Sequence, residues 1–120
     1  MGVLIVEDEV LIRDILMEEL RSHGHDVYEA PTGDEAARLI EDPPKDFTLL
    51  ITDVHLPGQH DGIDVGRLMR RRYPSLPIIY TTGRPDALVK LGSLGPRDAV
   101  VLKPYTPSQL MDVIRRLLAH

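Results

Sequence analysis

Short aliphatic runs alternate with amphipathic stretches along the whole chain, and this alternation constrains the fold more than any other feature. Consecutive apolar residues that stop abruptly at polar ones are typical of strands buried on both faces. Such strands are predicted at residues 3–6, 27–30, 47–52, 77–82 and 99–102. Strands that alternate with helices indicate a parallel sheet covered on both faces by helices, with right-handed crossovers. The predicted fold class is therefore α/β.

The stretches between the strands carry apolar residues at helical spacing and signals for helix ends. Residues 11–23 repeat apolar side chains every three or four positions, and Gly24 would end that helix. Thr32 and Glu35 predict a capping box for a second helix, which two prolines, Pro43 and Pro44, would terminate. The spacing therefore predicts a helix after each of the first two strands.

The second half of the chain continues the pattern less regularly. Asp61 and Asp64 suit the first turn of a third helix that runs to about Tyr73. Three glycines and two prolines in residues 83–98 leave room only for a short helix around residues 86–91. The last helix is predicted to start with Thr106 as its cap, followed by Pro107 and by Gln109, which would complete a capping box.

Length, charge and composition exclude several classes of protein. The 120 residues suffice for one hydrophobic core but not for two, so a single domain over residues 1–120 is predicted. The absence of cysteine excludes disulfides and thiol chemistry. The net charge of -5 argues against a nucleic-acid surface, and the arginines at 70–72 are better interpreted as cations that complement a helix dipole. Without a signal peptide or an apolar run of about 20 residues, a cytoplasmic protein is expected.

Polar residues of a particular kind follow four of the five predicted strands. Glu7 and Asp8 follow the first strand, Asp53 follows the third, Thr82 ends the fourth and Lys103 follows the fifth. Functional groups in open parallel sheets collect at the carboxyl ends of the strands. We therefore expect these five side chains to meet at one edge of the sheet.

These residue types suit phosphoryl transfer to a carboxylate. Carboxylate oxygens are ligands that Mg2+ prefers, and a carboxylate can act as a nucleophile toward phosphorus. A lysine and a hydroxyl can stabilise the oxygens of the transferred group. Each residue alone has an ordinary explanation as a helix cap or a turn residue, but their joint placement favours the functional one. His55 and His60 could suggest a transition-metal site, although solvated loop histidines are the simpler interpretation.

Four stretches of the chain resemble the receiver domain of bacterial two-component response regulators. They are VLIVEDE at residues 3–9, LLITDVHLPG at 49–58, PIIYTTG at 77–83 and VLKPY at 101–105. The resemblance covers the whole chain in order and spacing. It implies a flavodoxin-like, doubly wound five-stranded parallel sheet with strand order 2-1-3-4-5.

The resemblance also implies a role for each residue at the sheet edge. Asp53 would accept a phosphoryl group from a histidine kinase or a histidine phosphotransfer protein. The metal site for Mg2+ would consist of Glu7, Asp8, Asp53 and the backbone carbonyl of His55, while Thr82 and Lys103 would hold the phosphoryl group. Such a phosphoprotein assists its own phosphorylation and dephosphorylation but is not otherwise an enzyme.

The same resemblance describes how the domain would act in signal transduction. It would work in a phosphorelay as a monomer or weak homodimer and signal to an unknown downstream protein, without contacting nucleic acid or membrane itself. Many receivers carry Tyr or Phe three residues before the lysine, where this chain has Val100, with Tyr80 and Tyr105 nearby. An aromatic switch at that position is therefore absent, and a change of order in residues 83–98 could carry the response instead.

Other functions remain open at the level of sequence. The chain could be a stand-alone receiver or the receiver part of a longer protein. A small aspartate-nucleophile phosphatase is the alternative enzyme, but such enzymes usually carry a second Asp where this chain has His55. A flavin-binding relative of the fold would need a phosphate-cradling loop after the first strand, and the acids at residues 7–9 do not provide one.

Overall fold

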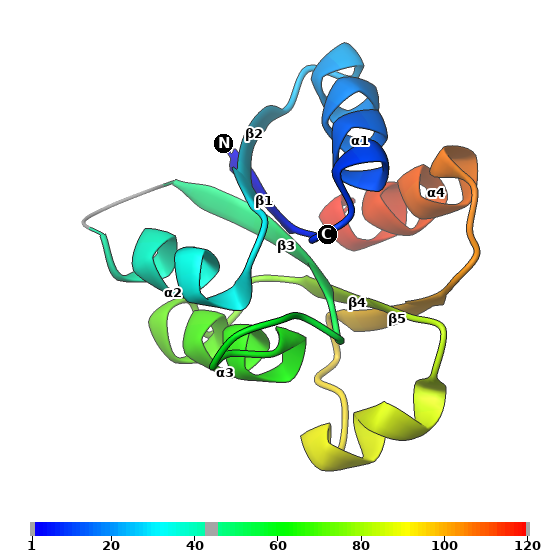
Figure 1. Cartoon of the computed structure of the whole chain (residues 1–120). Coiled ribbons are helices and arrows are strands. Elements are labelled where there is room, and N and C mark those ends of the chain that lie inside the picture. The colour runs from blue at the N-terminus through cyan, green and yellow to red at the C-terminus, as the bar shows by residue number, and fades with distance from the viewer. Residues whose placement is uncertain (1, 43–45, 120) are drawn as a thin grey trace.

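The computed structural model describes residues 2–42 and 46–119 and contains, in that part of the chain, one five-stranded parallel sheet. Its strands lie in the order β2-β1-β3-β4-β5 (Figure 1). They span β1 (Gly2–Val6), β2 (Asp26–Ala30), β3 (Phe47–Asp53), β4 (Ile78–Thr82) and β5 (Asp98–Leu102). Both the α/β class and the 2-1-3-4-5 order are confirmed. The ends of the strands differ from the predicted ones by only a residue or so, within the usual uncertainty of such boundaries.

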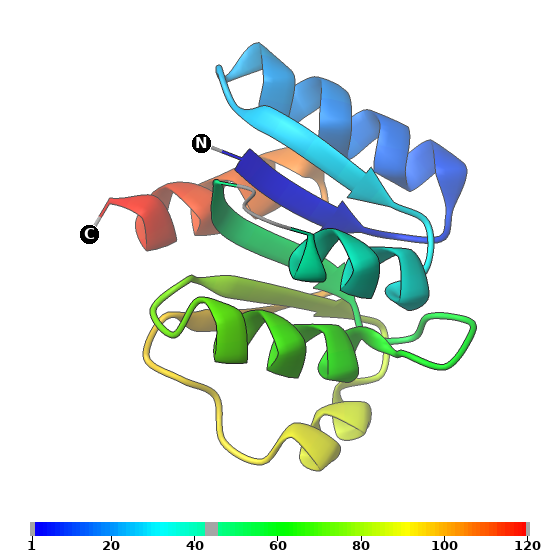
Figure 2. The same cartoon turned by 90° about the vertical axis from the view of Figure 1, so that its left-hand side faces the viewer.

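Helices cover both faces of the sheet (Figures 1 and 2). The elements are α1 (Val10–Ser22), α2 (Gly33–Glu41), α3 (Gly62–Arg72) and α4 (Pro107–Leu118), with a 3-10 helix, η1 (Pro85–Leu91), between β4 and β5. Helices α1 and α4 pack on one face, while α2, α3 and η1 lie on the other. The short helix predicted around residues 86–91 is therefore present, and it is 3-10 rather than α.

The core has two layers because neighbouring residues in a strand point to opposite faces. In β1, Leu4 faces α2 and α3, whereas Val3 and Ile5 face α1 and α4. The central strand β3 divides in the same way, with Leu50 on one side and Ile51 on the other. Burial on both faces explains why these strands read as unbroken aliphatic runs.

Side-chain caps start three of the helices. The capping boxes of α3, between Asp61 and Asp64, and of α4, between Thr106 and Gln109, are complete. In α2, the Thr32 side chain accepts a hydrogen bond from the backbone N–H of Glu35 at 3.1 Å. In the described part of the chain, the Glu35 side chain does not accept a bond from the Thr32 N–H in return. Only half of the predicted box therefore forms. Pro43 and Pro44, predicted to end α2, lie outside the described residues.

Among the described residues, no helix has the length and apolarity required to cross a membrane.

Candidate functional site

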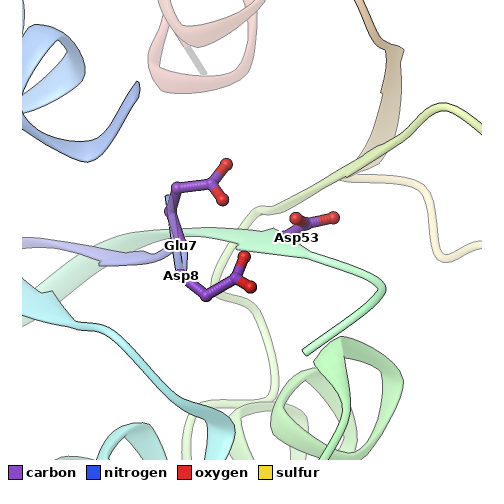
Figure 3. A group of neighbouring side chains, drawn as sticks. All are labelled: Glu7, Asp8 and Asp53. Carbon is purple, nitrogen blue, oxygen red and sulfur yellow. The ribbon is translucent and has the colours of Figure 1, made fainter. Parts of the chain in front are cut away.

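Three acidic side chains meet at the carboxyl edge of the sheet, where β1 and β3 run side by side. The parallel register places Val6 opposite Thr52, so Glu7 and Asp8 emerge next to Asp53 (Figure 3). One carboxylate oxygen from each acid lies within 4.8 Å of the others. Glu7 and Asp53 are buried, whereas Asp8 is exposed. The three acids thus come together as the sequence predicted.

Lys103 closes the cluster from the end of β5. Its Nζ atom donates hydrogen bonds to Oδ2 of Asp53 at 2.9 Å and to Oε1 of Glu7 at 3.1 Å. Burial alone would lower the pKa of Lys103, but the hydrogen bond and attraction from Asp53, followed by those from Glu7, raise it above its usual range. Lys103 is therefore a fixed positive charge in contact with both buried acids.

Burial raises the pKa of Glu7, and repulsion from Asp53 raises it further. A hydrogen bond from the backbone of Glu9, at 3.2 Å from Oε2, and the contact with Lys103 act in the opposite direction. Both oxygens of Glu7 are thus already engaged by groups of the protein. Asp8 is exposed and makes neither of these contacts, so it is the acid most accessible as a direct metal ligand. Asp53, like Glu7, has both oxygens engaged, by Lys103 and by the His55 N–H.

The donor set fits Mg2+. Carboxylate oxygens are hard ligands, and Mg2+ typically keeps several waters while using one or two protein carboxylates. Glu7 and Asp53 contribute carboxylates on the buried side of the cluster. Asp8 is exposed, which leaves room there for water. Among the described residues, no other group of three or more such ligand side chains occurs. His55 and His60 therefore do not build a transition-metal site there.

Thr82 is buried at the end of β4, and its hydroxyl is occupied by the loop that follows. The Oγ1 atom accepts a hydrogen bond from the backbone N–H of Arg84 at 2.9 Å and donates to the Arg84 carbonyl at 3.2 Å. The structure therefore brings Thr82 to the correct edge, but holds its hydroxyl on the loop and not on Asp53.

The segment after Asp53 forms a loop beside the acids. The N–H of His55 donates to Oδ1 of Asp53 at 3.4 Å, and the His55 side chain is exposed. At the base of the loop, the N–H of Gly62 donates to the carbonyl of Val54 at 2.9 Å. The backbone of His55 thus lies next to Asp53, consistent with its predicted part in the metal site.

Sequence reasoning missed Arg13, which supports the acids from behind. It is a buried residue of α1, and its guanidinium donates to the backbone carbonyl of Glu7 at 2.8 Å. The sequence did carry a signal for it: Arg13 lies on the same helical face as the core residues at positions 16, 17 and 20. An arginine inside an apolar stripe can indicate a buried hydrogen-bonding role.

Tyr105, two residues after Lys103, is a second residue near the site to which the sequence analysis assigned no role. Burial, followed by repulsion from Glu7, raises the pKa of its hydroxyl to about 12, so it stays protonated. Tyr105 lines a groove of about 370 Å³ between α1 and the segment 103–107 that leads into α4, together with Ile12, Ile15 and Lys103. This apolar groove therefore opens directly beside the cation of the site.

Replacing Lys103 by Met should tighten Mg2+ binding several-fold and slow phosphoryl uptake at least tenfold. The change removes a positive charge that is bonded to two of the acids and would compete there with Mg2+, and it removes a cation of the kind that stabilises phosphoryl oxygens. Calorimetric Mg2+ titration and the rate of labelling by a small phosphodonor would measure the two effects. Lys90→Met is the matched control, because Lys90 pairs instead with Asp61. Equal Mg2+ affinity in the Lys103 variant and the wild type would refute the competition.

Comparison with known proteins identifies close relatives in fold. The family model of the response regulator receiver domain matches residues 3–115. A response regulator receiver protein from Sinorhizobium medicae WSM419 has a TM-score of 0.88 at 24% identity, over 98% of this chain and 94% of that one. The receiver domain of the hybrid histidine kinase CckA gives 0.82 at 27% identity, over 98% and 99%. A CheY-like receiver domain protein from Methanospirillum hungatei JF-1 gives 0.83 at 27%, over 98% and 93%.

Proposed function

Because the chain belongs to the family of response regulator receiver domains, we propose that it accepts a phosphoryl group on Asp53 in a Mg2+-dependent reaction and signals by changing conformation. The observation that carries this proposal is the cluster at the sheet edge, where Lys103 bridges Asp53 and Glu7 beside Asp8. A buried carboxylate that is hydrogen-bonded to a cation and flanked by metal-ligand acids is suited to attack phosphorus.

Different residues have different roles in the transfer of the phosphoryl group. An oxygen of Asp53 forms the bond to phosphorus while the bond from phosphorus to the donor breaks. Lys103 stabilises negative charge on the phosphoryl oxygens, and Arg13 holds the end of β1 that carries Glu7 and Asp8. Bound Mg2+ would supply neutralisation of the charge shared by the attacking acid and the anionic donor.

The proposed donors are a histidine kinase or a histidine phosphotransfer protein. The first test is incubation with Mg2+ and a small phosphodonor such as acetyl phosphate, followed by measurement of the intact mass. The second replaces the small molecule by a phosphorylated histidine phosphotransfer protein. A chain that gains no phosphoryl group from either source would contradict the proposal.

The output is proposed to leave the site through the segment from Gly83 to Asp98. Phosphorylation adds about two negative charges beside Lys103. For the Thr82 hydroxyl to donate to the phosphoryl group, its proton must leave the Arg84 carbonyl, to which it is now bonded at 3.2 Å. The segment that begins at Arg84 contains no fully buried residue over Pro85–Leu91. It is held on the α3 side by half-buried packing and by exposed polar contacts, from Lys90 to Asp61 at 3.0 Å and from Arg67 to the Lys90 carbonyl at 2.7 Å, which a shift of the segment would have to break.

The usual aromatic switch is not available for this response. Val100 is a half-buried residue packed against the core of the α2 and α3 face, and Tyr80 lies opposite it on β4, fully buried. The ring of Tyr80 is also confined by Gly66, where an added Cβ would lie 2.1 Å from the Tyr80 hydroxyl oxygen. Neither residue can swing as an exposed aromatic ring would, so the loop remains as the movable element.

Beryllium fluoride with Mg2+ should therefore shift and broaden backbone NMR signals throughout residues 83–98. Couplings of this kind are typically about 1–3 kcal/mol, so the active arrangement should exist as a minor population beforehand. Mg2+ alone and the Asp53→Asn variant with beryllium fluoride serve as controls. Changes confined to the residues around the acids, with residues 83–98 unaffected, would rule out this route.

A further inference from the structure

Asp34, in the first turn of α2, hydrogen-bonds to the tip of the loop between β3 and α3. Its Oδ1 atom accepts from the backbone N–H of His60 at 3.0 Å and from Nδ1 of the His60 ring at 2.7 Å. Its Oδ2 atom lies 3.4 Å from the backbone N–H of Gln59. The ring nitrogen must carry a proton to donate to a carboxylate. One acid thus contacts two consecutive residues that are 25 and 26 positions away in sequence.

Two glycines allow α2 and this loop to approach so closely. A Cβ atom at Gly33 would lie 2.0 Å from the carbonyl oxygen of His60. Gly58 has φ of +96°, a conformation that side chains other than glycine rarely adopt, and a Cβ there would lie 2.7 Å from Oδ2 of Asp34. The close approach of α2 and the loop therefore depends on glycine at both positions.

The charge on Asp34 suits this contact. The hydrogen bond from the His60 side chain, ahead of all other influences, lowers the pKa of Asp34 below its usual value. The carboxylate consequently remains charged and accepts hydrogen bonds near neutral pH. It also lies at the positive end of α2, where an acid is favoured.

The loop is held at two points, and the residues nearest the acids lie between them. At the base, Gly62 donates to the Val54 carbonyl, and at the tip Asp34 holds Gln59 and His60. His55, whose backbone carbonyl is the proposed third metal ligand from the protein, follows the base directly. Figure 2 shows the loop extending beside the start of α2. With the tip released, the backbone between the two points would lose its contact with α2 and keep the long 3.4 Å bond from the His55 N–H to Asp53 and the packing of Leu56.

We propose that Asp34 and His60 are positioning residues for the metal site, which fix the loop that presents the His55 carbonyl. The inference rests on the proposed function, since it assumes that Mg2+ binds beside Asp53. Neither residue touches the metal or the phosphoryl group. Their effect is on the fraction of molecules in which the loop is ordered for binding.

Asp34→Ala should weaken Mg2+ binding about tenfold, the lower end of what is lost when groups that orient metal ligands are removed. His60→Ala should act in the same direction. His60→Asn should restore most of the affinity, because its amide places an N–H close to where Nδ1 donates. Glu35→Ala is the matched control, since it removes an exposed acid from the same turn of α2. Calorimetric Mg2+ titration and thermal unfolding of each variant provide the measurements.

A purely structural role would give a different pattern. Positioning predicts that phosphoryl uptake by Asp34→Ala needs more Mg2+ for half-maximal rate but approaches the wild-type rate at saturation. If Asp34→Ala and Glu35→Ala bind Mg2+ equally well, or if His60→Asn is as weak as His60→Ala, the inference is wrong. If the wild type itself takes up no phosphoryl group, the proposed function fails, while Mg2+ titration of the variants still tests the positioning.

Discussion

Replacing Asp53 by Asn is expected to abolish phosphoryl uptake and to leave the fold intact. The amide has nearly the same shape as the carboxylate but cannot act as the nucleophile. Asp53 ends the central strand β3, and its hydrogen bond to Lys103 can be kept by the amide oxygen. Because the change also removes one of two buried neighbouring acids, no large loss of stability should follow.

Labelling with a small phosphodonor and Mg2+, followed by intact-mass measurement, would record the loss. Asp14→Asn is a suitable control, because Asp14 is an exposed acid on α1 outside the cluster. Thermal unfolding and backbone NMR would establish that the Asp53 variant is folded. Labelling of Asp53→Asn at the wild-type level would show that another residue is the acceptor.

Replacing Asp8 by Ala is expected to weaken Mg2+ binding by at least tenfold. Mg2+ relies on few protein carboxylates, and Asp8 is the exposed acid of the cluster, free of the contacts that occupy both oxygens of Glu7. We therefore expect Asp8 and Asp53 to be direct ligands and Glu7 to act mostly through bound water. Phosphorylation should in turn tighten Mg2+ binding, because it adds oxygen ligands and negative charge.

Calorimetric Mg2+ titration of Asp8→Ala against Glu9→Ala isolates this effect. Glu9 is the adjacent acid; it is exposed like Asp8, and it lies outside the group of three. The Glu9 variant should bind Mg2+ nearly as the wild type does. A wild-type dissociation constant for Asp8→Ala would mean that the ion is held elsewhere.

Most of the fold could be predicted from the sequence because each strand is recognisable from its own short run of residues. Burial on both faces requires unbroken aliphatic runs, and the residues that end them fall at the carboxyl edge of a parallel sheet. That rule alone brought Glu7, Asp8, Asp53 and Lys103 together. The strand order came from the resemblance to receiver domains, since periodicity does not determine which strands are neighbours.

What could not be predicted depends on contacts between distant segments. The pairing of Asp34 with His60 requires α2 to pack against the loop after β3, and neither residue carries a local signal of it. His60 was interpreted as a solvated loop residue; its side chain is 37% exposed, but its ring is also bonded to Asp34, a contact that the sequence did not predict. The position of the Thr82 hydroxyl on Arg84 depends on a side-chain rotamer and a turn, which sequence pattern does not specify.

Asp53 is proposed to form an acyl phosphate when Mg2+ is present. The wild-type protein would be treated with a small phosphodonor with and without Mg2+, reduced with borohydride, digested and analysed by tandem mass spectrometry. Borohydride converts an aspartyl phosphate to homoserine and leaves phosphate esters of serine and threonine unchanged. We expect homoserine at position 53 only in the sample that contained Mg2+. Modification at another residue, or at Asp53 to the same extent without Mg2+, would contradict it.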